Sequence, residues 1–247
     1  MNKQYHINVS SKDIEESQHL IICGDPGRVP RISSFLKDSR EISFNREYRI
    51  HLGYINNKPV LISSCGIGAP STAIGIEEFG ILGVSNMIRV GTSGILSRKV
   101  KLGDIVSATG AIRDEGTTHE YVPASFPAVA HPDVVIALRQ AVKHFNLEQR
   151  FHEGIVHSKD AFYSETPKLI PDSVNAENKW KTWIRAGTLI TEMECSTLFV
   201  LGTIRGWRTG GIMAAIGDTE EGKLIIDHMK GQKEAIEVAI EAIKRLL

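Results

Sequence analysis

An arginine inside an apolar segment is the feature that most constrains how this chain can fold. Residues 86–94 read N-M-I-R-V-G-T-S-G, so Met87, Ile88 and Val90 surround Arg89. The apolar run shows no clear alternation, which is typical of a strand covered on both faces. A guanidinium in such a strand loses its hydration, and an anion must offset that cost. We therefore expect either a partner carboxylate or a bound anion beside Arg89.

Glycines and hydroxyls follow Arg89 and predict a turn at the carboxyl end of this strand. Gly91 and Gly94 would let backbone N–H groups approach a ligand, while Thr92 and Ser93 would add hydroxyls. If a carboxylate of the protein pairs with Arg89, the same turn is only structural. The segment alone leaves both interpretations open.

A second glycine turn follows the predicted strand His19–Cys23. Its sequence, G-D-P-G-R-V at residues 24–29, leads into a helix expected over residues 29–36. The first N–H groups of a helix have no partners within the helix, so this arrangement suits an anion.

Three arginines stand in or near such contexts, namely Arg28, Arg46 and Arg89. Each alone is more typical of a surface or structural charge. Together they resemble a phosphate clamp, because arginine binds phosphate oxygens in a forked geometry. The chain has no G-x-x-x-x-G-K-[ST] motif, and Gly66-Ile67-Gly68 does not extend to G-x-G-x-x-G. Inorganic phosphate is therefore favoured over the phosphate tail of a nucleotide.

Strands and helices alternate along the chain. Strands are expected over residues 19–23, 42–55, 60–64, 86–94, 105–112, 154–157 and 211–216. Helices are expected over residues 29–36, 72–82, 132–145, 179–185 and 234–247, and residues 192–201 read as a ligand loop that enters a helix. This order predicts an α/β fold with three layers, α/β/α, around a mixed and mostly parallel sheet. Without a linker, residues 1–247 fit a single domain.

Composition excludes several classes of protein. Lys plus Arg and Asp plus Glu each total 29, so no net charge favours nucleic acid or an anionic membrane. No apolar run approaches the roughly 20 residues that span a bilayer, and the N-terminus lacks an apolar signal region, so a cytoplasmic protein is expected. Cys23, Cys65 and Cys195 lie in apolar segments and are expected to be buried thiols, not a disulfide or a metal site.

Two acidic positions carry candidate chemistry. T-E-M-E-C at residues 191–195 reads either as a solvated turn or as a sugar site, where Glu194 accepts bonds from vicinal hydroxyls and Met193 packs on the ribose. Asp218 follows the last predicted strand. It is either a turn or capping residue, or a general acid for a leaving group.

Several motifs together resemble one family. They are Y-H near the N-terminus, G-D-P-G-R-V, N-R-E-Y, G-I-G-A-P-S, R-V-G-T-S-G, F-P-A-V-A, K-D-A-F-Y and T-E-M-E-C. This set, at consistent spacing over nearly the whole chain, resembles the nucleoside phosphorylases, which include uridine phosphorylases, hexameric purine nucleoside phosphorylases and methylthioadenosine phosphorylases. The match looks most like the bacterial uridine phosphorylases.

The resemblance implies a set of site residues. For phosphate it implies Gly24, Arg28, Arg89 and Thr92, with Arg46 reaching in from a neighbouring subunit. For ribose it implies Met193 and Glu194, with His6 of the neighbour at the 5′ end. For the base it implies Gly94, Phe162 and Glu192. Thr166 and Lys168 stand near the places where uridine phosphorylases usually carry a glutamine and an arginine.

The resemblance also implies an assembly and a reaction. Glu47, Ile67 and Ser71 match a monovalent-cation site, for K⁺, at the dimer interface of some uridine phosphorylases. No other cofactor is expected, and inorganic phosphate is a co-substrate. Because Arg46 and His6 would act across an interface, at least a homodimer is expected, and the family suggests a hexamer built as a trimer of dimers. Phosphate would attack the anomeric carbon as the base departs, with Arg89, Glu194 and Asp218 in catalytic roles.

The expected function is phosphorolysis of uridine to uracil and ribose 1-phosphate. The alternative is a purine nucleoside or methylthioadenosine phosphorylase, because purine-cleaving relatives carry an aspartate near Asp218. A hydrolytic nucleosidase or a non-catalytic nucleoside-binding protein would have little use for the three arginines. Those two classes are therefore less favoured.

Overall fold

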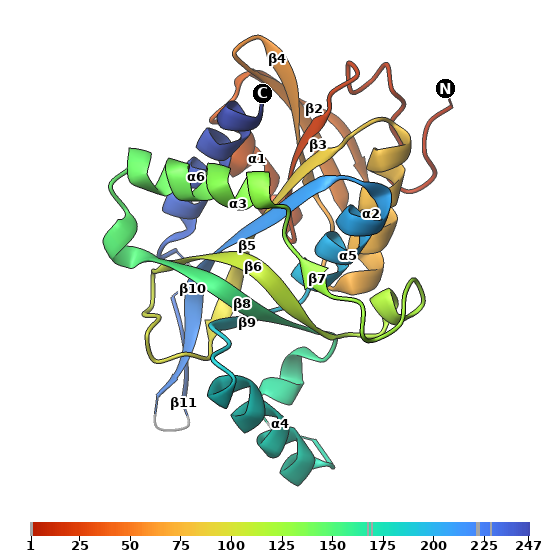
Figure 1. Cartoon of the computed structure of the whole chain (residues 1–247). Coiled ribbons are helices and arrows are strands. Elements are labelled where there is room, and N and C mark those ends of the chain that lie inside the picture. The colour runs from red at the N-terminus through yellow and green to blue at the C-terminus, as the bar shows by residue number, and fades with distance from the viewer. Residues whose placement is uncertain (1, 167, 169, 221–222, 228) are drawn as a thin grey trace.

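The computed structural model describes residues 2–166, 168, 170–220, 223–227 and 229–247, and one sheet runs through them (Figure 1). Its strands are β1 (His19–Cys23), β2 (Lys37–Asn45), β3 (Tyr48–Ile55), β4 (Lys58–Ser64), β5 (Asn86–Ile95), β6 (Ile105–Asp114), β7 (Ala128–Val129), β8 (Phe151–Lys159), β9 (Ile190–Glu192), β10 (Arg208–Glu220) and β11 (Lys223–Ile226). The helices are α1 (Val29–Ser33), α2 (Ala69–Ile81), α3 (Pro132–His144), α4 (Ser173–Arg185), α5 (Cys195–Arg205) and α6 (Gln232–Leu246). Short 3₁₀ turns cover Pro26–Arg28, Thr117–His119, Glu148–Arg150 and Phe162–Glu165.

The sheet is mixed, as predicted. Parallel pairs join β4 to β1, β1 to β5 and β5 to β10, and antiparallel pairs add β3 and β2 at one edge. β10 also pairs with β6, which continues through β8 to β9, and β9 returns to the end of β5. Five strands, β5, β10, β6, β8 and β9, therefore close into a ring. The sequence analysis predicted layers but not this closure.

Helices cover both faces of the central strands. Along β1, Leu20 and Ile22 belong to one hydrophobic cluster, whereas Ile21 and Cys23 belong to another. Successive strand residues point to opposite faces, so the two clusters lie on opposite sides of the sheet. The first cluster contains residues of α2 and α5, and the second contains residues of α1, α3 and α6. Because buried residues fill both clusters, β1 and β5 read as continuous apolar runs in the sequence.

The prediction of one strand over residues 42–55 was wrong. The structure divides it into β2 and β3, which pair antiparallel with Asn45 opposite Tyr48. The turn falls on Arg46 and Glu47, and Arg46 has a φ of +54°. No glycine or proline marks this turn, so sequence patterning missed it.

The predicted turn after Arg89 was also wrong, because β5 continues to Ile95 and places Arg89 in mid-strand. Gly91 serves packing there. A Cβ atom on Gly91 would lie 2.9 Å from Cζ of Arg89, since alternate strand residues share a face. This glycine leaves the space in which the guanidinium lies. The strand expected over residues 211–216 is likewise longer, and β11 follows it.

None of the helices in the described part of the chain combines the length and the apolar character that crossing a membrane requires. The three cysteines are all free and buried, as predicted. Burial raises the pKa of the Cys23 and Cys65 thiols to about 12, which makes them unreactive as thiolates at neutral pH.

Candidate active site

A cavity of about 790 Å³ lies where the carboxyl ends of β1, β5 and β10 approach β9. Ligand sites in α/β sheets commonly occupy this position, outside the carboxyl ends of the strands. Six short stretches line most of it: residues 24–28, 66–67, 89–96, 159–165, 191–194 and 216–218. They come from parts of the chain far apart in sequence, and the ring closure between β9 and β5 brings them together.

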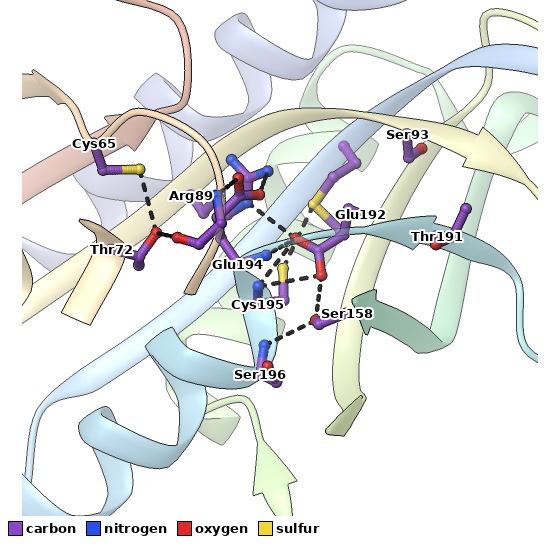
Figure 2. Close-up of polar contacts among 12 residues, drawn as sticks. Cys65, Thr72, Arg89, Ser93, Ser158, Thr191, Glu192, Glu194, Cys195 and Ser196 are labelled. Atoms are coloured by element: carbon purple, nitrogen blue, oxygen red, sulfur yellow. Dashed lines mark hydrogen bonds and ion pairs between the residues drawn. The ribbon is translucent and has the colours of Figure 1, made fainter. Parts of the chain in front are cut away.

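Arg89 is buried at this cavity and pairs with two carboxylates of the protein (Figure 2). Its Nε donates to Oε2 of Glu192 at 3.2 Å, and its Nη2 donates to Oε2 of Glu194. Its Nη1 is buried and has no hydrogen-bond partner among the described residues. The protein therefore neutralises the guanidinium and still leaves one donor for a ligand. The partner carboxylate expected from the sequence is therefore confirmed, and the bound anion stays a prediction.

Glu192 is the anchor of this cluster. Its side chain is fully buried, and it accepts bonds from the backbone N–H groups of Glu194 and Cys195 and from the Ser158 hydroxyl. Burial opposes ionisation, but Arg89 and these donors hold the pKa of Glu192 below its usual value. Glu192 therefore stays charged. Both of its oxygens accept hydrogen bonds from the protein, and its side chain also lines the cavity.

Glu194 behaves in the opposite way. Its Oε1 accepts from the N–H of Gly68 at 2.8 Å, at the start of α2. Burial raises its pKa, and the charge of Glu192 adds to that effect against the attraction of Arg89. Of the two carboxylates, Glu192 holds the charge more firmly.

The cluster extends to the loop after β6. The Ser158 hydroxyl accepts from the N–H of Ser196 (Figure 2). The Ser196 hydroxyl in turn donates to Oε1 of Glu115 at 3.1 Å. Glu115 in turn accepts from the N–H and hydroxyl of Thr118. A buried polar chain thus connects Arg89 with the loop that begins near Glu115. No periodic pattern in the sequence indicated this chain of contacts.

The other residues expected to bind phosphate lie at the same cavity. Gly24, Arg28 and Thr92 all line it with Arg89. A Cβ atom on Gly24 would lie 3.0 Å from the carbonyl oxygen of Gly66, so the ends of β1 and β4 approach closely there. Among the described residues, the one ion pair of Arg28 is long, 3.9 Å from Nε to the Asp25 carboxylate. It is far less constrained than Arg89.

The sugar and base candidates divide into two groups. Met193, Glu194, Gly94, Phe162, Glu192 and Asp218 line the cavity. Thr166 and Lys168 are exposed and are not part of its lining. The structure therefore does not bring these last two residues to the cavity within one copy of the chain.

His6 and Arg46 lie together, away from this copy's own cavity lining. The Asn45 side chain donates to the carbonyl of His6 at 2.7 Å, and the Arg46 guanidinium lies 5.9 Å from the Tyr5 ring centre. Glu78 of α2 holds the segment, because it accepts from the N–H groups of His6 and Ile7 and contacts Nδ1 of His6 at 2.6 Å. Two residues far apart in sequence therefore share one surface region.

Glu47, Ile67 and Ser71 meet beside Gly66. A Cβ atom on Gly66 would lie 3.0 Å from Cγ of Glu47 and 3.4 Å from the Ser71 hydroxyl, which bonds the Ile67 carbonyl at 3.3 Å. All three offer oxygen atoms, the donor type that alkali cations bind. Among the described residues, no group of three His, Cys, Asp or Glu side chains forms a metal cluster.

The cavity residues that were not singled out from the sequence include Lys159, Glu165 and Trp180. Lys159 is the first residue of K-D-A-F-Y, which was noted only as a family motif. Its Nζ lies 2.6 Å from Oε1 of Glu165. Glu165 and Trp180 stand in polar, aperiodic stretches, where no pattern distinguishes a cavity residue from a surface residue.

The fold and the cavity define a class: an α/β protein with a cavity at its strand ends and, in that cavity's wall, a buried arginine paired with two carboxylates. The chain belongs to the phosphorylase superfamily, whose family model matches residues 18–247. This membership confirms the resemblance that the motifs indicated.

Three relatives illustrate the match. The chain is 40% identical to a uridine phosphorylase of Treponema pallidum (strain Nichols), over 99% of this chain and 94% of that one. It is 40% identical to a uridine phosphorylase of Thermococcus kodakarensis, over 98% and 86% of the two chains. It is 37% identical to a guanosine phosphorylase of Halorubrum lacusprofundi, over 94% and 88%.

Proposed function

We propose that this protein is a nucleoside phosphorylase that converts uridine and phosphate to uracil and ribose 1-phosphate. The observation that carries the proposal is the buried Arg89, which lines the cavity and whose Nη1 has no hydrogen-bond partner among the described residues. A buried donor without a partner is costly, so a site that contains one is built for a ligand acceptor. Phosphate oxygens are such acceptors, and the named activities of the relatives agree with this choice.

The reaction needs no covalent enzyme intermediate. A phosphate oxygen forms a bond to the anomeric carbon while the glycosidic C–N bond breaks, and the bonding electron pair leaves with the base. Arg28, Arg89 and Thr92 hold the phosphate and lower the entropic cost of joining two substrates. The phosphate charge then stabilises the developing positive charge on the sugar, an electrostatic effect realised mainly in the transition state.

Glu194 and Met193 are proposed to hold the ribose. Glu194 would accept hydrogen bonds from the vicinal hydroxyls, and Met193 would pack on the sugar. The contacts of Glu194 with Arg89 and the N–H of Gly68 fix its position before substrate binds. Preorganisation of this kind reduces the free energy lost on binding.

Part of the site is proposed to come from a second copy of the chain. His6 and Arg46 share a surface region and do not line their own cavity, which supports their action in a neighbour's site. We therefore propose at least a homodimer and, with the family, a hexamer built as a trimer of dimers. A K⁺ ion at Glu47, Ile67 and Ser71 fits the same interface and would support its assembly.

The base is proposed to stack near Phe162, with Gly94 lining the same pocket. Asp218 gives a second candidate function, a purine nucleoside phosphorylase, because this carboxylate lines the cavity and could protonate a departing purine. The guanosine phosphorylase relative supports this alternative. Thr166 and Lys168 would act on the base only if their loop moved or a neighbour supplied them.

The remaining proposals concern the whole chain. Residues 1–247 are proposed to form one nucleoside phosphorylase domain, which works in the cytoplasm with no cofactor beyond the cation. Support for one domain comes from the sheet, which combines β1 to β4 with β10 and β11.

The experiment that tests the base preference compares uridine, inosine and methylthioadenosine, each with phosphate and each assayed for free base. We expect uridine to give the highest kcat/KM. Release of purine bases without release of uracil would overturn the uridine phosphorylase proposal. It would favour the purine nucleoside phosphorylase that Asp218 indicates.

A further inference from the structure

Lys159 and Glu165 form an ion pair in the wall of the cavity, next to the positions proposed for the base. The Lys159 side chain is 4% exposed and that of Glu165 is 24% exposed, and both line the cavity. The ammonium lies 5.7 Å from the centre of the Phe162 ring. A charged pair on a ligand-binding wall offers one donor and one acceptor to whatever binds there.

The geometry of the pair fixes which atoms face a ligand. Nζ of Lys159 contacts Oε1 of Glu165 and donates to the Thr191 hydroxyl at 2.9 Å, so two of its three protons are occupied. Oε2 of Glu165 has no hydrogen-bond partner among the described residues and lies toward Gly94. A Cβ atom built on Gly94 would stand 3.6 Å from it.

The loop that carries Glu165 is held in place. Glu165 ends the 3₁₀ turn Phe162–Glu165, and Nε1 of Trp180 donates to the carbonyl of Ser164 at 2.7 Å. Trp180 belongs to α4 and also lines the cavity. The Trp180 hydrogen bond therefore ties the backbone next to Glu165 to α4.

We propose that Lys159 and Glu165 determine the base specificity by reading a lactam edge, that is, an N–H beside a C=O. Oε2 of Glu165 accepts a hydrogen bond from the ring N–H. Nζ of Lys159 donates a hydrogen bond to the carbonyl oxygen through its third N–H group. Uracil, hypoxanthine and guanine present this edge. Cytosine and adenine present a ring nitrogen acceptor beside an amino group, which would face the carboxylate and the ammonium with the wrong polarity. This inference rests on the proposed nucleoside phosphorylase function.

The discrimination should be large. A site built to hydrogen-bond a ligand group rejects analogues that lack it, because buried polar groups are then left unpaired, by factors that reach about 10⁴. We therefore expect the wild-type protein to prefer uridine over cytidine by at least about 10³ in kcat/KM.

The test compares phosphorolysis of uridine and cytidine by the wild type, Glu165→Gln and the control Glu177→Gln. Glu177 lies on α4, forms an exposed ion pair with Lys181 and is not among the described residues that line the cavity. A glutamine at position 165 can rotate its amide to donate to the ring nitrogen of cytosine. We expect it to lower the ratio of uridine to cytidine kcat/KM at least about tenfold, while the KM for phosphate stays unchanged. Glu177→Gln should leave the ratio as in the wild type.

Two results would overturn the proposal: wild-type turnover of cytidine comparable to that of uridine, or an unchanged ratio in folded Glu165→Gln. An equal loss for both substrates would also contradict it, because that is the effect of a purely structural ion pair. If the wild type releases no base in the presence of phosphate, the proposed function fails instead. Calorimetric binding of uracil against cytosine then tests the pair independently, and equal affinities would overturn it.

Discussion

Arg89 illustrates how one residue can combine a structural role with a proposed ligand-binding role. Two carboxylates neutralise its charge, so it offers phosphate a fixed N–H donor more than a net positive charge. The larger uncommitted positive charge in the cavity lies on Arg28, whose nearest carboxylate is 3.9 Å away. The two arginines should therefore respond differently to substitution.

Arg28→Ala should weaken phosphate binding without weakening the fold. The loss of charge-assisted hydrogen bonds, about 1.5–3 kcal/mol, corresponds to a rise of roughly 10- to 100-fold in the KM for phosphate. The melting temperature should change little, because Arg28 makes no close ion pair. Arg31→Ala, an exposed arginine on α1, is the matched control and should leave the KM unchanged. An unchanged KM for phosphate in Arg28→Ala would show that Arg28 does not bind phosphate.

Glu192→Gln and Glu194→Gln should differ in stability. The pKa of Glu192 is lowered, so its charge stabilises the folded state above its unfolded pKa near 4.5, and that stabilisation is lost as pH falls toward the folded pKa. The pKa of Glu194 is raised, so its charge is held at a cost at neutral pH. We expect Glu192→Gln to lose about 3 kcal/mol at pH 7 and Glu194→Gln distinctly less. Urea unfolding should show that the two variants differ less in their free energy of unfolding at pH 4 than at pH 7. No difference at pH 7, or Glu194→Gln as the less stable variant, would contradict this charge distribution.

At the scale of elements, the β2–β3 turn and the N-terminal segment form one unit anchored on α2. Glu78 binds the backbone of His6 and Ile7 and one ring nitrogen of His6, so the other ring nitrogen is the one that would reach a ligand. In the proposed assembly, this anchor would let an otherwise irregular segment present the His6 side chain to a neighbouring subunit.

Glu78→Ala should release this segment. We expect the KM for the nucleoside to rise about tenfold, the cost of one lost hydrogen bond, with a smaller change in the KM for phosphate. Glu77→Ala, which removes only an exposed pair with Arg205, is the matched control. Equal effects of the two substitutions would show that the anchor has no role in nucleoside binding.

Some strands and cavity residues could be predicted from the sequence, and others could not. Apolar runs located β1 and β5, and motif spacing identified most cavity residues, because strand burial and glycine turns leave local signals. The turn at Arg46 was missed since its left-handed backbone carries no glycine. The Lys159–Glu165 pair and the ring closure depend on contacts between distant segments, β9 with β5 above all, and local patterns do not encode such pairings.

At the scale of the whole molecule, the account requires sites shared between copies. Arg46 from one copy would complete the cavity that Arg28 and Arg89 of another copy begin. The chain alone would then be an incomplete enzyme, and activity would depend on assembly.

Mixing two impaired variants, assayed at a phosphate concentration well below their KM, tests this sharing. Arg46→Ala and Arg28→Ala subunits should each be impaired, yet a mixed dimer has one site with both arginines intact. Random reassembly makes about half of the dimers mixed, so the mixture should regain up to about a quarter of wild-type activity. If the activity of the mixture equals the mean of the activities of the two separate variants, Arg46 does not act in a neighbouring subunit's site.

The most direct test of the central claim is the release of uracil from uridine with and without inorganic phosphate, with ribose 1-phosphate followed by phosphorus NMR. The account predicts uracil release only when phosphate is present, with one ribose 1-phosphate formed for each uracil. Release of uracil and free ribose in the absence of phosphate would contradict it, because hydrolysis has no need for the donor that Arg89 keeps at the cavity.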